Sequence, residues 1–67
     1  MTKIVLNGEP CEVDEGLTVT GLLDASAYAG RRVAVEINRE IVPKSQHAQR
    51  IVHDGDRIEI VQAMGGG

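Results

Sequence analysis

The residues best suited to chemistry stand at the end of the sequence, where Ala63 and Met64 lead into Gly65-Gly66-Gly67. Glycine has no side chain and loses the most backbone entropy when it is ordered, so three in a row pack nothing and hold no strand. Without a Cβ they also fit a narrow channel in extended or positive-φ conformations without strain. We therefore expect residues 63–67 to be a flexible stalk, with Gly65 and Gly66 threading into another protein's active site and presenting the Gly67 carboxylate.

The chemistry open to such a carboxylate requires a partner. A carboxylate is a poor electrophile and must be converted to a mixed anhydride, such as an acyl-adenylate, before a nucleophile can displace it. The chain has 67 residues, and chains of this size bury only about 60% of their unfolded surface, which makes a drug-sized internal pocket improbable. We therefore expect another protein to activate Gly67, and we expect no catalytic residue in this chain.

The other reactive side chains favour structural roles. Cys11 alternates with Val13 in a strand-like segment, where a lone cysteine is more often a small core residue than a reactive thiol. His47 and His53 have no cysteine or aspartate cluster at ligand spacing around them, so we expect surface histidines and no metal site. A helix face and a tight turn explain the aspartates that could serve in acid–base catalysis, which are Asp24, Asp54 and Asp56.

Composition excludes several classes of partner. The net charge is −3, with ten acidic and seven basic residues, and Tyr28 is the sole aromatic residue. Nucleic acid is therefore not an expected partner, because phosphate binding needs clustered Lys and Arg, and base stacking needs aromatic rings. The acidic balance suits a partner with a basic or neutral docking face.

The cellular compartment is predicted from two features. Cys11 is the single cysteine and can form no internal disulfide, which favours a reducing cytoplasm. No apolar run reaches transmembrane length, and the first residues lack the pattern of a signal peptide. We expect a soluble cytoplasmic protein that binds no membrane.

The first half of the chain reads as a hairpin followed by a helix. Residues 3–7 and 11–13 alternate in the manner of strands, and Asn7-Gly8 between them is a strong hairpin-turn signal. Thr18 is a plausible N-cap for a helix of two to three turns that ends near Gly30.

The second half reads as three more strands. Residues 32–38 form the clearest strand, and a turn leads into the short strand Ile41-Val42, which Pro43 stops. Ser45 is expected to cap a helical turn that runs to residue 49. Residues 57–61 form the last strand.

The element order β-β-α-β-β-β predicts an α+β fold and a single domain over residues 1–67. A mixed sheet of four to five strands, packed on one helix, covers the apolar face in two layers. The first and last strands run parallel at its centre, so the chain between them acts as a long crossover. The expected core consists of Ile4, Leu6, Val13, Leu22, Leu23, Val33, Val35, Ile37, Ile58 and Ile60.

The sheet face away from the helix carries the expected docking surface. Strand alternation places on this face the apolar residues Val5, Ala34, Val61 and Ala63 and the charged residues Arg32, Glu36, Arg57 and Glu59. With the first and last strands side by side, Val5 and Val61 would form an apolar patch at the root of the stalk. We expect partners to dock on Val5, Ala34, Val61, Ala63 and Met64.

A set of short motifs resembles a known family over essentially the whole chain. The motifs are Asn7-Gly8-Glu9, Leu17-Thr18-Val19 before Leu22-Leu23, residues 33–38, Glu40-Ile41-Val42-Pro43, residues 54–61 and Gly66-Gly67. Together they are similar to the ThiS family of thiamine-biosynthesis sulfur carriers, which are ubiquitin-like β-grasp proteins. The small subunit of molybdopterin synthase is the nearest alternative, but its approach to the glycines is rich in phenylalanine and proline, and residues 61–64 contain neither.

The resemblance implies a mechanism for the stalk. An E1-like adenylyltransferase of the ThiF type would use ATP and Mg²⁺ to adenylate the Gly67 carboxylate, and a persulfide sulfur donor would convert it to a thiocarboxylate. Thiazole synthase of the ThiG type would then take the sulfur. The chain itself would bind no cofactor stably and would be a co-substrate rather than an enzyme.

Two other classes of function stay open on the residues alone. The glycine stalk could be conjugated to lysines of target proteins, as in a ubiquitin-like modifier. The body could instead be a plain β-grasp interaction module, since one fold hosts many functions.

Overall fold

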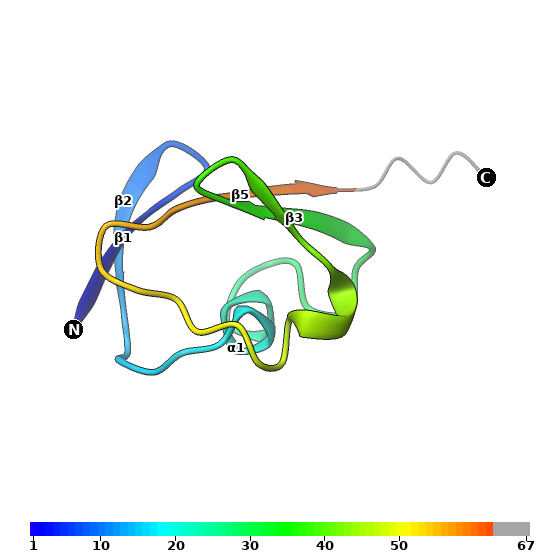
Figure 1. Ribbon diagram of the computed structural model, residues 1–67, viewed down its shortest axis with the longest axis horizontal. Helices are drawn as coiled ribbons and strands as arrows, with labels where there is room; N and C mark the ends of the chain where they lie inside the picture. The colour runs from blue at the N-terminus through cyan, green and yellow to red at the C-terminus, as the bar shows by residue number, and fades with distance from the viewer. Residues whose placement is uncertain (63–67) are drawn as a thin grey trace.

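The chain begins with a β-hairpin whose turn is made by Asn7 and Gly8. In the computed structural model, which describes residues 1–62, β1 (Thr2–Leu6) and β2 (Glu9–Val13) pair antiparallel (Figure 1). Asn7 and Gly8 have φ values of 49° and 84°, the sign that a type I′ turn requires at both positions. The predicted hairpin is confirmed, and β2 begins two residues earlier than expected because pairing with β1 starts directly after the turn.

The helix α1 (Val19–Asp24) lies across one face of the sheet and is shorter than expected (Figure 1). Its N-cap is Thr18, whose hydroxyl accepts a hydrogen bond from the Gly21 amide at 3.1 Å, as the sequence predicts. The helix has six residues and does not reach Gly30. One reason is that the Ser26 hydroxyl donates to the Leu23 carbonyl at 3.0 Å, so a side chain occupies a carbonyl that a continuing helix would use.

A second hairpin and a single helical turn follow α1. β3 (Val33–Ile37) pairs antiparallel with β4 (Glu40–Val42), and the chain then forms the 3₁₀ turn η1 (Lys44–Gln46). The expectation that Ser45 caps this turn is wrong. The turn begins directly after Pro43, whose carbonyl accepts from the Gln46 amide at 2.8 Å, so Ser45 lies inside it.

The last strand, β5 (Arg57–Gln62), is the central strand of the sheet. The strand order is β2-β1-β5-β3-β4, with β5 parallel to β1 and antiparallel to β3. This order confirms the expected mixed sheet with its first and last strands adjacent at the centre.

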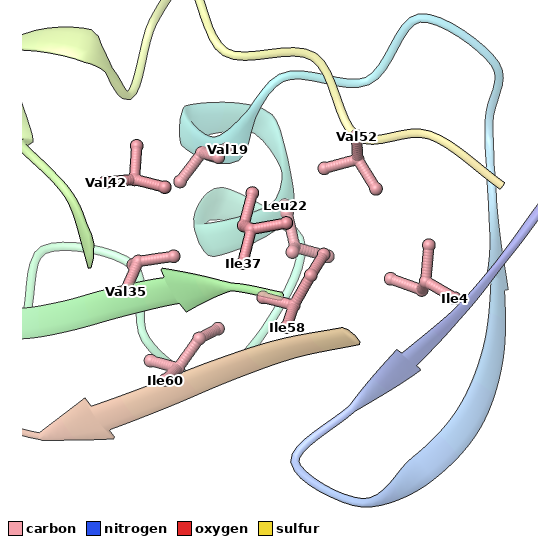
Figure 2. Close-up of a cluster of buried hydrophobic side chains, with 9 residues drawn as sticks. All are labelled: Ile4, Val19, Leu22, Val35, Ile37, Val42, Val52, Ile58 and Ile60. Carbon is pink, nitrogen blue, oxygen red and sulfur yellow. The ribbon is translucent and has the colours of Figure 1, made fainter. Parts of the chain in front are cut away.

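The core lies between the sheet and α1, where the inward side chains of β1, β3 and β5 meet Val19 and Leu22 of the helix (Figure 2). Six of the ten expected core residues are buried, and Leu6, Val13, Leu23 and Val33 are partly buried against them. The prediction omitted three buried residues, which are Val19, Val42 and Val52. Val52 lies outside any strand or helix, so no hydrophobic period marked it.

Candidate functional site

The candidate site begins where β5 ends, at Gln62. The residues predicted to carry the chemistry, Gly65, Gly66 and Gly67, and the expected docking residues Ala63 and Met64, lie outside the described residues. The structure places their point of attachment: Gln62 is opposite Val33 of β3, at the end of the central strand (Figure 1). Residues 63–67 therefore follow the central strand, which has a neighbouring strand on each side.

Side chains as well as backbone hold β5 in place. Ile58 and Ile60 are buried. At the end of β1, the backbone N–H of Asn7 donates a hydrogen bond to the Ile58 carbonyl at 2.8 Å. The Asn7 side chain continues this ladder, because its Oδ1 accepts from the Ile60 amide at 2.8 Å while its Nδ2 donates to the Tyr28 hydroxyl at 3.1 Å. A turn residue of the first hairpin thereby connects β5 to the segment after α1.

The start of β5 is fixed by the buried carboxylate of Asp56. Its Oδ2 accepts from the His53 amide at 2.8 Å, and its Oδ1 accepts from Asn38 Nδ2 at 3.0 Å. Asn38 Oδ1 in turn accepts from the Arg57 amide at 3.0 Å. These bonds close the turn before β5, so Asp56 has the structural role expected of it.

The expected apolar patch of Val5 and Val61 does not form. The parallel register places Val5 beside Arg57, whereas Val61 lies beside Ala34. Val61 is four positions after Arg57 in β5, which corresponds to about 13 Å along a strand. The prediction that Val5 and Val61 adjoin is wrong because β1 pairs only with the first residues of β5.

Ile41 also points outward from the sheet, although the sequence analysis did not predict it on the face away from the helix. It lies opposite Glu36 on β4 and is 65% exposed, and Val61 is 57% exposed. Ala34, Ile41 and Val61 therefore share the uncovered sheet face, and we call them the outer patch. The alternation of Ile41 with the buried Val42 was the signal that could have identified it.

A like-charge pair interrupts this face. Glu36 and Glu59 are directly opposite each other in the β3–β5 ladder, and neither forms an ion pair within residues 1–62. Like charges in this position are destabilising.

The remaining candidate residues have structural surroundings. Cys11 is half-buried against the core, and Asp24 is exposed at the end of α1. His53 is exposed, but His47 is buried, with Nε2 at 3.0 Å from the Val42 carbonyl oxygen, so the expectation of a surface histidine is wrong there. The reason is that its segment packs under α1, where the His47 carbonyl accepts from the Thr20 amide at 3.0 Å.

Two further properties concern residues 1–62. No helix among them is long and apolar enough to span a membrane. Among these same residues, no three His, Cys, Asp or Glu side chains are grouped so as to hold a metal ion.

Comparisons with known proteins agree with this geometry. The model of the ThiS family matches residues 4–67. The sulfur carrier protein ThiS of Escherichia coli K12 is 38% identical over 65 residues, which cover 97% of this chain and 98% of that protein. The crystal structure of ThiS from Geobacter metallireducens has a TM-score of 0.81 and 40% identity, and the match covers 98% of this chain and 100% of that one. The β-grasp arrangement expected from the sequence is confirmed.

A longer protein is also similar. A thiazole synthase of Paramagnetospirillum magneticum is 51% identical over 65 residues, which are 97% of this chain and 20% of that protein. The chain therefore spans about a fifth of the length of this relative.

Proposed function

The chain belongs to the ThiS family of small sulfur carrier proteins, which are not catalysts, and we propose that it carries sulfur for thiamine biosynthesis. The observation that supports this most is the continuity of the family match, which runs from β1 through the central strand β5 to the terminal glycines at residue 67. The central strand as a root, and the three glycines at residues 65–67, suit delivery of a terminal group into a partner's site.

The proposed cycle has three chemical steps at Gly67, and partners carry out all of them. An E1-like enzyme adenylates the carboxylate with ATP and Mg²⁺ and releases pyrophosphate. The outer sulfur of a persulfide donor then attacks the acyl carbon and displaces AMP, which gives an acyl disulfide. A thiol reductant cleaves its S–S bond and is oxidised to a disulfide with the donor, so that the product is a thiocarboxylate. The partner's site provides positioning and electrostatic stabilisation, while Gly65 and Gly66 provide access.

The proposed acceptor of the sulfur is thiazole synthase. A region similar to 97% of this chain makes up about a fifth of one protein with that name, so a ThiS-like segment is part of that polypeptide. This arrangement supports thiazole synthase as a partner of the separate chain. We place this cycle in the cytoplasm, because the single cysteine of the chain fits a reducing compartment.

The proposed docking surface is the uncovered sheet face. The residues proposed from the sequence are Val5, Ala34, Val61, Ala63 and Met64, and we add Ile41 because it is exposed on the same face. Ala34 and Val61 are paired next to the root of the stalk, which favours this end of the face over the end at Val5.

Intact-mass measurement tests the proposed function. The chain is incubated with the activating enzyme, ATP, Mg²⁺, a persulfide donor and a thiol reductant, and the expected product carries one sulfur in place of one oxygen. A chain that lacks Gly67 is the control. Isopeptide adducts would instead indicate a ubiquitin-like modifier, and an unchanged mass would leave only an interaction module.

A further inference from the structure

A shallow groove opens beside the root of the stalk, and we call it the root groove. Its volume is about 320 Å³, and its lining includes Leu23, Arg31, Arg32, Val33, Lys44 and His47. A smaller hollow of about 240 Å³ adjoins it and shares Arg31, Arg32 and Lys44. Arg31 and Arg32 directly precede β3, whose first residue, Val33, is paired with Gln62. The groove therefore lies at the end of the sheet where β5 ends.

The early end of β4 creates the root groove. β4 ends at Val42, opposite Val35, and the chain then turns through Pro43 into η1. Within residues 1–62, Val33 and Ala34 consequently have no partner on the β4 side of β3. An unpaired strand edge of this kind can receive an extended segment of another protein.

The floor of the root groove is apolar and fixed. Leu23 and Val33 pack against the core, and His47 is 8% exposed with its ring bonded to the Val42 carbonyl. A floor of this type suits the stem of a peptide side chain better than a fully hydrated small anion.

The rim of the root groove is positively charged. Arg31, Arg32 and Lys44 are exposed, and none of them forms an ion pair with any residue from 1 to 62. Of the acidic residues in the described part of the chain, Asp24 alone lines either hollow. Three positive charges thus gather at one end of a chain whose net charge is −3.

Acidic residues gather at the other end of the molecule. Glu12, Asp14 and Glu15 lie in and after β2, and two cations are beside them: Lys3 is opposite Glu12, and the N-terminal ammonium is 3.8 Å from Glu15. The acidic residues still outnumber these cations, and Figure 1 shows this end opposite the end of β5. The molecule therefore has a charge asymmetry along its length. Such a field orients an approaching protein and speeds its association.

We propose that the root groove binds an acidic surface segment of thiazole synthase, a proposal that rests on the proposed function. A protein that takes up residues 63–67 must approach the end of β5, and there it meets the rim of unpaired cations. Charge complementarity at this point fixes the orientation of the carrier while the stalk enters the synthase. The local charge thus reverses the expectation from net charge, since the favoured docking face of the partner is acidic rather than basic.

A pair of charge-reversal variants with equal net charge tests the proposal. The groove variant is Arg31→Glu with Lys44→Glu, and the matched control is Lys3→Glu with Arg39→Glu, two exposed positions away from this end of the sheet. Association rate and Kd with thiazole synthase are measured over a range of salt concentrations, and thermal unfolding establishes that both variants are folded. We expect the groove variant to bind roughly tenfold more weakly at low salt and with little salt dependence, and the control to stay within about twofold of wild type.

Three results would overturn the proposal. An equal loss in both variants would show that only net charge matters. Unchanged synthase binding by the groove variant would show that the groove is not used. Saturable NMR shifts at the groove with inorganic phosphate, together with unchanged synthase binding, would identify a small-anion site instead. If wild type gains no sulfur from the activating enzyme and binds no synthase, the proposed function fails as well, which distinguishes the two failures.

Discussion

At the scale of single residues, Arg39 stands out among residues 1–62 because it has a positive φ and is neither glycine nor asparagine. The second hairpin turns on Asn38 and Arg39, with φ values of 53° and 70°. Type I′ turns favour glycine at the second position, because a residue with a Cβ pays roughly 1 to 2 kcal/mol for left-handed backbone. The first hairpin has glycine at the equivalent position, Gly8.

Arg39→Gly is therefore expected to stabilise the protein. We expect a gain of about 0.5–1 kcal/mol, since the relief of strain exceeds the added entropy of the unfolded chain. Urea unfolding at constant m-value measures it. Gly8→Ala is the matched control and should cost about 1 kcal/mol, because a Cβ there meets open space but the φ of 84° stays unfavourable. A loss of stability in Arg39→Gly would show that the arginine side chain makes a compensating contact.

Asp56 is the second residue whose replacement has a clear consequence. Asp56→Ala leaves the His53 amide and the Asn38 side-chain amide without their acceptor, and we expect a loss of about 2–3 kcal/mol. Asp54→Ala is the comparison, because Asp54 is exposed and accepts one bond, from the Lys3 amide at 2.6 Å; its loss should be below about 1 kcal/mol. Equal midpoints for the two variants in chemical unfolding would contradict this account.

At the scale of elements, sequence patterns located every strand, but they misjudged the length of the helix. Alternation and turn chemistry are local, and Asn7-Gly8 and the strand at residues 33–37 were therefore readable. The helix pattern continued beyond Asp24, whereas the side-chain bond from Ser26 to the Leu23 carbonyl competes with the helix there. Burial of Val52 also depends on tertiary structure, because its amide bonds the Leu17 carbonyl at 2.8 Å across the fold.

The N-terminus of α1 provides a prediction at this scale. Thr18→Ala removes the hydroxyl that accepts from the Gly21 amide, and we expect a loss of about 1 kcal/mol. Thr18→Ser keeps an oxygen in this position and should retain most of the stability. Thermal unfolding followed by circular dichroism compares them; equal losses would show that the methyl group of Thr18 matters rather than the cap.

At the scale of the whole molecule, the register between β1 and β5 could not be read from the sequence. A parallel pair is joined by a long crossover and not by a turn, so nothing local fixes which residues face each other. Strand alternation correctly placed Ala34 and Val61 on the uncovered face. It could not show that Val5 and Val61 lie at different ends of that face. The root groove was equally hidden, because it arises from the point at which β4 ends.

The register predicts that the two ends of the outer face differ in their importance for docking. Val61→Glu and Val5→Glu introduce the same charge on the same face, at the root of the stalk and about 13 Å from it. We expect Val61→Glu to weaken binding of thiazole synthase by roughly tenfold and Val5→Glu to have a smaller effect. Surface plasmon resonance with immobilised synthase provides the affinities. A larger effect at Val5 would move the docking surface to the other end of the sheet.

The claim on which the whole account depends is that the Gly67 carboxylate accepts and then donates sulfur. The most direct test is a chain with Gly67 blocked as a C-terminal amide, compared with the free acid. Both are assayed in a reaction that contains the activating enzyme, ATP, Mg²⁺, a persulfide donor, a thiol reductant, thiazole synthase and the synthase's own carbon and nitrogen substrates. We expect the amide to unfold at the same temperature as the free acid and to support no thiazole formation. Thiazole formation at the wild-type rate from the blocked chain would contradict the account.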